Sequence, residues 1–188
     1  MGKTTRIPTL LASLLLIGSG VVFLLSGSVA ALTAITESYQ TETDVPAGVI
    51  VSLVKDTQTQ VEPSIPSNVD NLLGVVVNPD SSLLNVSTGV GKQAQIATSG
   101  TMPVLVSDIN GEVKRGDHIT ASPLRGIGML ANGNVRVVGI AQGDMSGKHE
   151  EIIKDVDGND QKVTIGEVPV LINVAYFFKE PEKSIVPA

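Results

Sequence analysis

The sequence predicts a mainly β protein, in which a single N-terminal transmembrane helix is followed by a compact β-barrel or sandwich-like domain. Two observations predict the β domain. Beyond residue 48, short apolar runs recur at intervals of about 8 to 12 residues between turn-forming residues, the spacing of a barrel or sandwich. The chain has no Trp, three Phe and two Tyr. Its core must therefore come from Val, Ile and Leu, of which the β-branched members favour strands.

The helix is predicted from residues 7–35, which contain no Asp, Glu, Lys or Arg. About 20 apolar residues cross a bilayer core of about 30 Å. Lys3 and Arg6 precede the segment, and basic residues beside a membrane segment mark the cytoplasmic side. Residues 1–36 are therefore assigned as cytoplasmic N-terminus and anchor in the cytoplasmic membrane, with membrane lipid around the helix. Ser28-Val29-Ala30 also fits a signal-peptide cleavage site, so removal of the segment is the alternative.

The remaining chain is divided by composition into a stalk, an extracytoplasmic β domain and a tail. Residues 37–47 are polar and predict a stalk. Residues 48–178 form the β domain, and the Pro-containing residues 179–188 form a loose tail. Strands are expected at residues 48–54 and 72–77, with residues 83–87 pairing back as a hairpin. Residues 55–71 hold Pro63 and Pro66 and are expected to form a long surface loop.

The densest turn signals lie in the second half of the domain. Because Gly, Asn and Asp accept turn conformations, reversals are expected at Ser99-Gly100, Asn110-Gly111, Arg115-Gly116-Asp117 and Asn132-Gly133. Alternation in Val135-Arg136-Val137 predicts a half-buried strand. Asp157-Gly158, with apolar runs on both sides, predicts a hairpin that joins residues 150–156 to residues 161–178.

Charge and cysteine content exclude several kinds of function. All nineteen acidic residues lie at or after Glu37, and the same part of the chain has eleven basic residues, so it carries a net charge of −8. An acidic domain repels phosphate backbones, and we expect no nucleic-acid partner. The chain has no cysteine. Disulfides, thiolate metal sites and cysteine nucleophiles are thereby excluded.

Six ordered segments carry a resemblance to a known family. They are Gly48-Val-Ile-Val-Ser52, Leu73-Gly-Val-Val-Val77, Pro103-Val-Leu-Val106, Gly111-Glu-Val-Lys-Arg-Gly-Asp-His-Ile-Thr-Ala-Ser122, Gly126-Ile-Gly-Met-Leu-Ala131 and Val138-Gly-Ile-Ala141. Over about half of the chain, this set resembles the β-rich C-terminal domains of bacteriophage tail appendages and bacterial surface proteins, of the peptidase G2 or intramolecular-chaperone type. The resemblance implies a domain that assembles with copies of itself, usually three, and displays or caps a surface structure. Some members of that family cut their own chain.

Candidate chemical groups are few. His118 follows Asp117, a pairing that can serve acid-base chemistry, but a turn that starts a strand is the interpretation we favour. His149 has no sequence cue that joins it to His118. Asp155-Val-Asp157-Gly-Asn-Asp160 spaces its carboxylates like a calcium loop but departs from the EF-hand pattern, so a hairpin turn is expected. Ser122 lies outside any Gly-x-Ser-x-Gly motif.

The sequence therefore predicts a membrane-anchored structural or binding module that self-assembles and displays a β domain, and not an enzyme. No catalytic, cofactor-binding or metal-binding residue is assigned, and a homo-oligomer is expected. One alternative is a membrane-anchored, self-processing endopeptidase or hydrolase. Another is a pilin-like subunit, although the early helix lacks the acidic residue that such subunits carry.

Overall fold

The computed structural model describes residues 34–78 and 91–179, which belong to a compact unit, Leu32–Ala188. Within the described residues the chain forms ten β-strands and one short 3-10 helix, so the mainly β part of the predicted fold is confirmed. The elements in chain order are β1 (Ile35–Gln40), β2 (Ile50–Leu53), β3 (Val61–Pro63), η1 (Val69–Asn71), β4 (Leu72–Val77), β5 (Gln93–Ser107), β6 (His118–Ala121), β7 (Gly128–Leu130), β8 (Val135–Ala141), β9 (Ser146–Lys154) and β10 (Asp160–Phe177).

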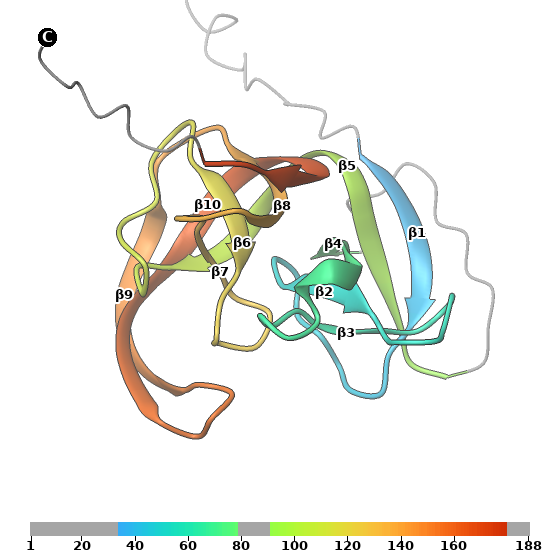
Figure 1. The fold of residues 1–188 in the computed structure, drawn as a ribbon. Helices are drawn as coiled ribbons and strands as arrows, with labels where there is room; N and C mark the ends of the chain where they lie inside the picture. Colours follow the sequence, from blue (N-terminus) through green and yellow to red (C-terminus); the bar gives the residue numbers. More distant parts are fainter. Residues whose placement is uncertain (1–33, 79–90, 180–188) are drawn as a thin grey trace, which may run out of the picture. The chain divides into compact units, whose positions relative to one another are not determined.

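The first half of β5 belongs to an antiparallel sheet, drawn on the right of Figure 1. It pairs with β1 on one side and with β4 on the other. Strand β4 then pairs with β2, and β2 with β3, so the strand order is β1-β5-β4-β2-β3. A bridge between Gln40 and Gln60 joins the end of β1 to the residue before β3. This sheet therefore curls until its two edges meet.

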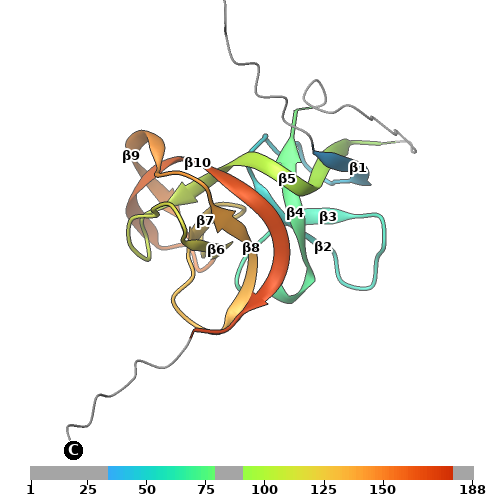
Figure 2. The same ribbon diagram turned by 90° about the horizontal axis from the view of Figure 1, so that it is seen from above.

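The second half of β5 belongs to a closed ring of strands, on the left of Figure 1. It pairs with β10, which pairs with β8, followed by β6 and β7. A single parallel bridge between Val106 and Gly128 returns from β7 to β5 and closes the ring. Strand β10 is long and curved (Figure 2), and its first half extends beyond the ring to pair with β9.

A bend at Gly100 lets β5 serve both sheets. Gly100 has a φ of 96°, a conformation that residues with a side chain rarely adopt. It lies opposite Ile172, where the pairing of β5 with β10 begins. The sequence predicted a chain reversal at Ser99-Gly100, and this prediction is wrong. A glycine inside a strand can bend it without ending it, and the pairing on both sides of Gly100 keeps the strand continuous.

Strands β2 and β4 have apolar contacts on both of their faces. Alternate residues Ile50, Val75 and Val77 pack into a cluster that fills the ring, whereas Val51 and Val76 pack into a second cluster inside the curled sheet. A strand covered on both faces needs a continuous apolar run and not alternation. This explains why the sequences of both strands consist almost entirely of Val, Ile and Leu.

Other local predictions have mixed outcomes. The strand at residues 72–77 is confirmed as β4, and Val137 of β8 is buried as its alternation predicted. The loop predicted over residues 55–71 contains β3 and η1, with Pro63 at the end of a strand that pairs only with β2. The hairpin strand predicted at residues 83–87 lies outside the described residues, as does the tail beyond Lys179.

The predicted transmembrane helix requires a correction. Among the described residues, no helix is long and apolar enough to cross a membrane. Most of the predicted segment, residues 7–33, lies outside the described residues, while Ile35 and Thr36 at its end belong to β1. Their backbones pair with Ser99 and Ala97 of β5, and an apolar run alone does not distinguish a helix from a strand. The single-pass topology and the localisation in the cytoplasmic membrane lose their support with the helix.

Strand β1 also changes the predicted stalk. Residues 37–47 were assigned to a polar stalk, yet β1 runs to Gln40 and its Tyr39 packs against the cluster inside the curled sheet. Burial, together with a hydrogen bond to Glu37, raises the pKa of Tyr39 to about 12. The pattern of the β1 sequence is polar because only one of its faces meets the core.

Candidate functional site

The Asp117-His118 pair is part of a turn, as the sequence predicted. Gly116 has a φ of 92°, and an Asp117 carboxylate oxygen accepts a hydrogen bond from the backbone N–H of Lys114 at 2.7 Å. Strand β6 begins at His118, whose ring stacks on Phe177 with 4.1 Å between ring centroids. His149 lies on β9 instead, with its Nε2 3.4 Å from a carboxylate oxygen of Glu151. The two histidines therefore have separate local roles.

Ser122 is buried and is engaged by its own loop. Its Oγ accepts a hydrogen bond from the backbone N–H of Leu124 at 3.0 Å and donates to the Leu124 carbonyl oxygen at 3.2 Å. A hydroxyl used in this way holds the turn after β6. The geometry gives Ser122 a structural role and shows no base beside it among the hydrogen bonds of the described residues.

The Asp155 carboxylate organises the turn between β9 and β10. One of its oxygens accepts the backbone N–H groups of Asp157 and Asn159, and the other accepts the side-chain amides of Asn159 and Gln161. These hydrogen bonds lower the pKa of Asp155, and the bond from Gln161 has the largest effect. The hairpin predicted at Asp157-Gly158 is confirmed, and the carboxylate that suggested a calcium loop holds the hairpin's turn.

The turn has the backbone geometry of a three-residue hairpin loop. The Gly158 N–H donates to the Asp155 carbonyl oxygen at 3.0 Å, and the Asp155 N–H donates to the Asn159 carbonyl oxygen at 2.9 Å. Gly158 has a φ of 85°, which its lack of a side chain permits. This is a type I turn followed by a bulge at glycine. It fixes which residues of β9 direct their backbone groups towards β10.

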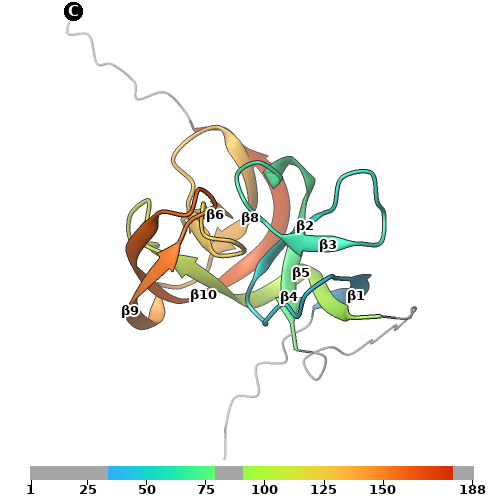
Figure 3. The same ribbon diagram turned by 90° about the horizontal axis from the view of Figure 1, so that it is seen from below.

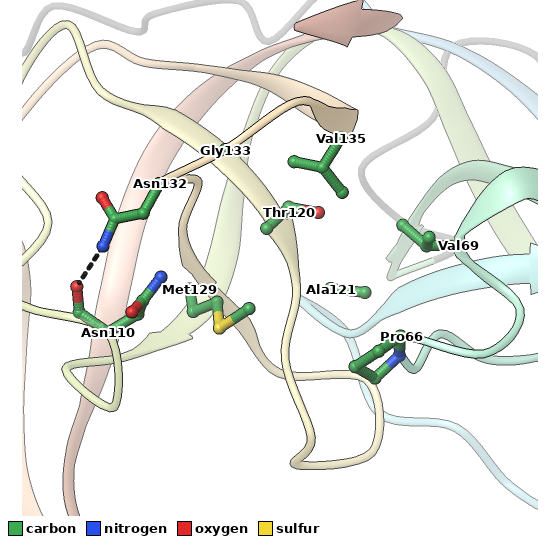
Figure 4. A pocket seen from close by; sticks show the side chains of 9 residues that line it. All are labelled: Pro66, Val69, Asn110, Thr120, Ala121, Met129, Asn132, Gly133 and Val135. Atoms are coloured by element: carbon green, nitrogen blue, oxygen red, sulfur yellow. Dashed lines mark hydrogen bonds between the residues drawn. The ribbon is translucent and has the colours of Figure 1, made fainter. Parts of the chain in front are cut away.

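A shallow pocket of about 220 Å³ lies between β6, β7, the start of β8 and the loop before η1 (Figure 4). Its walls are mainly apolar, and two asparagine amides stand at one side, where the Asn132 amide donates to the Asn110 carbonyl oxygen at 3.2 Å. The nine described residues that line it are Pro66, Val69, Asn110, Thr120, Ala121, Met129, Asn132, Gly133 and Val135. None of these side chains ionises near neutral pH, so the pocket offers binding surface without a general acid or base.

One wall of this pocket is positioned by Asn68. Its side-chain oxygen accepts the Ile65 N–H at 2.8 Å, and its amide donates to Glu62 at 3.1 Å. Nearby, the buried hydroxyls of Ser52 and Ser64 form a hydrogen bond of 2.7 Å. These contacts order the segment that carries Pro66 and leads into η1 at Val69, and the sequence did not predict them. They join side chains from different elements, which spacing along the chain does not reveal.

A second pocket, of about 320 Å³, is more polar. Glu42, Glu62 and Arg125 line it together with residues that flank β3. Glu42 accepts a hydrogen bond from Gln60 at 3.4 Å, and the Arg125 side chain is exposed. The pocket thus combines two carboxylates with one guanidinium, a mixed charge that does not select one sign of ligand.

Strand β9 forms an exposed edge of the sheet in the described unit. Eight of its nine residues are exposed, and β9 pairs only with β10. Ile152 is 68% exposed, although it is a large aliphatic residue in the middle of the strand. In all three ribbon views β9 lies at the outer margin of the unit (Figures 1, 2 and 3).

Ion pairs flank Ile152 on the hairpin surface. Lys162 lies 2.8 Å from Glu150, and Lys154 lies 2.7 Å from Asp160. The Glu150 carboxylate raises the pKa of Lys162. At the base of the hairpin, Lys148 pairs with Glu112 and lowers the pKa of that carboxyl. Because all these groups are exposed, the pairs add little stability but define the charge pattern along the edge.

This edge was not predicted from the sequence, although the sequence of β9 carries a signal for it. Ile152 and Ile153 are adjacent, and adjacent strand residues point to opposite faces. Ile153 packs against a small cluster with Val163 and Ile165, so Ile152 must face away from it. A strand with one aliphatic residue on each face, among charged neighbours, predicts one exposed apolar side chain.

Fold and surface together define a mainly β module with an open, charged strand edge and shallow pockets. No model of a known protein family matches the chain, and a search of curated proteins finds no match. The resemblance to appendage and surface domains therefore stays a prediction.

Proposed function

We propose that this β unit is a self-assembling structural or binding module that acts by pairing with copies of itself and not by catalysis. The observation that carries the proposal is β9, a nine-residue strand that pairs on one side only among residues 34–78 and 91–179 and exposes nearly all of its residues. An open strand edge presents unpaired N–H and C=O groups that another strand can bind.

The surroundings of the candidate catalytic residues support the non-catalytic part of the proposal. A nucleophile requires a base within hydrogen-bond reach. The Ser122 hydroxyl is bonded to Leu124, and the His118 ring is stacked on Phe177. Self-processing remains the alternative function, and it makes a distinct prediction, because a chain that cuts itself yields fragments of reduced mass.

The test is the mass of the purified unit Leu32–Ala188, which contains all described strands and the three apolar clusters of the core. Light scattering at tens of micromolar is expected to give a multiple of the mass of one chain, and mass spectrometry the intact chain. A monomeric mass would refute self-assembly. A shortened chain would support self-processing in place of a purely structural role.

A further inference from the structure

We propose that β9 forms a two-fold antiparallel pair with β9 of a second copy, centred on Ile152. This inference rests on the proposed function and specifies its partner and its register. It follows from three features of the hairpin: the direction of the backbone groups of β9, the length of its regular part, and the order of its charges.

The turn geometry determines which backbone groups of β9 are open. In an antiparallel pair, residues whose N–H and C=O groups face the partner strand alternate with residues whose groups face away. The Asp155 N–H points to Asn159 across the hairpin. The register sets Ile153 opposite Gln161 and Glu151 opposite Val163. The backbone groups of Ile153 and Glu151 therefore bond to β10. The backbone groups of Glu150, Ile152 and Lys154 face outward.

The regular part of the edge begins after Gly147. That glycine has a φ of 63°, which is incompatible with an extended strand, and the pairing with β10 is irregular between Ile165 and Glu167. Only residues 148–154 can therefore pair regularly with a second strand. A second copy must bond to the outward groups of its even-numbered residues, which leaves few registers.

Charge selects one of these registers. A pair centred on Glu150 sets Glu150 opposite Glu150 of the second copy. A pair centred on Glu151 likewise sets two Glu151 carboxylates opposite each other, and it also sets Lys148 opposite Lys154. Like charges directly opposite destabilise a sheet, whereas opposite charges and apolar pairs stabilise it. A pair centred on Ile152 sets Ile152 against Ile152 of the second copy, and Glu150 against Lys154 in both directions. Of these three registers, it is the one in which every outward pair is favourable.

The neighbouring strand extends this complementarity. Lys154 already lies 2.7 Å from Asp160, and Glu150 lies 2.8 Å from Lys162. In the joined sheet, Lys154 would stand between Asp160 of its own chain and Glu150 of the second copy. The two Ile152 side chains, each 68% exposed in the single chain, would cover each other at the two-fold axis. The same charges would oppose other registers, which gives the edge specificity.

The decisive experiment uses two charge reversals, Glu150→Lys and Lys154→Glu, in the unit Leu32–Ala188. Each variant alone sets like charges opposite each other in the proposed register, so its light-scattering mass is expected to fall twofold from that of the parent dimer. Mixed in equal amounts, the two variants have opposite charges at both pairs between residues 150 and 154. The mixture is expected to recover the dimeric mass. Glu167→Lys, the same charge change at an exposed residue of β10, is the control and should stay dimeric.

The outcomes distinguish failure of this inference alone from failure of the proposed function as well. A monomeric parent refutes both. A parent oligomer that neither variant dissociates, or a threefold mass, keeps self-assembly but overturns the β9 interface, because two-fold pairing of one edge closes at two copies. Variants that dissociate without recovering on mixing overturn the register.

A second measurement decides the matter if either charge variant fails to fold. Because the chain has no cysteine, Ile152→Cys introduces a single thiol. Opposite residues in a bonded antiparallel pair have Cα atoms about 5.5 Å apart, which a disulfide can span. Mild oxidation is expected to give a covalent dimer for this variant and not for Ile35→Cys, at an equally exposed position on β1. Equal cross-linking of both variants would overturn the inference.

Discussion

Strands β4 and β9 belong to the same unit but differ completely in what surrounds them. Five of the six residues of β4 are buried, and its two faces contact different apolar clusters. Eight of the nine residues of β9 are exposed, and within the described part of the chain only one of its edges is paired. The sequence of β4 consists of Leu, Gly and Val, whereas β9 combines Lys, His and Glu with two adjacent Ile residues.

This difference shows that two kinds of interaction build the sheets of this protein. Packing determines β4, because every side chain there must fit against a neighbour. The turn at Asp155 and the pairing with β10 determine β9, whose outward side chains are not constrained by the core. Substitutions in β4 should therefore change stability, and substitutions on the outward face of β9 should change association.

The largest expected effect comes from placing one carboxylate in each strand. Val75 of β4 is fully buried, and Val75→Asp puts an unpaired charge in the core, at a cost of several kcal/mol. Since a whole domain is stable by about 5 to 15 kcal/mol, this variant should be largely unfolded. Ile152→Asp in β9 should change stability by no more than about 0.5 kcal/mol. Thermal melting followed by circular dichroism in dilute protein compares them, and equal losses would show that β9 is packed like β4.

A smaller effect is expected from a single methyl group in β4. A Cβ added at Gly74 would lie 2.2 Å from the Ala97 carbonyl oxygen of β5, so the paired strands would have to separate. Gly74→Ala should cost about 1 to 3 kcal/mol, as overpacking does. Gly133→Ala is the matched control, because nothing lies within 4 Å of its added Cβ. If the two variants have the same midpoint in urea, the close contact at Gly74 is not a constraint.

The sequence predicted the elements that depend on local chemistry. The strand at residues 72–77, the turn at Gly116-Asp117 and the hairpin at Asp157-Gly158 all follow from residues next to one another in the chain, and all are confirmed. Glycine, aspartate and β-branched residues restrict the backbone directly, so the pattern carries the structure.

The features that the sequence did not predict depend on distant partners. Strand β1 is polar on one face, and only its pairing with β5 makes it a strand. Gly100 carries a turn signal, yet pairing on both sides converts the reversal into a bend. The pocket beside Asn110 and the hydrogen bond between Ser52 and Ser64 join segments far apart in the chain. The exposed edge of β9 was missed because exposure depends on which strands lack a neighbour, which is a property of topology.

The smallest expected effect concerns how the β9 hairpin is held. If the turn and not packing determines β9, the hairpin should contribute a pH dependence through Asp155. Its pKa is lowered from 3.8 in the folded state, so the unfolded chain binds the proton more readily. The stabilising contribution of the carboxylate is therefore fully present above this value and is lost as the pH falls below it towards the folded pKa.

Asp155→Asn removes the titrating group but keeps a side-chain oxygen that can accept the backbone N–H groups of the turn. The variant should melt slightly below the parent at pH 7, because the amide nitrogen that replaces the second carboxylate oxygen cannot accept the hydrogen bond from the Gln161 side chain. Below about pH 4 the two melting curves should converge, since the parent also loses its charged acceptor there. Asp157→Asn, in the same turn but with a side chain that makes none of these bonds, is the control and should keep the parent's dependence on pH. If the melting temperatures of the parent and Asp155→Asn differ by a constant amount from pH 7 down to about pH 2, the hairpin is held by its contacts with β10 and Pro123 and not by the carboxylate. Strand β9 would then resemble β4 in how it is stabilised more than its exposure indicates.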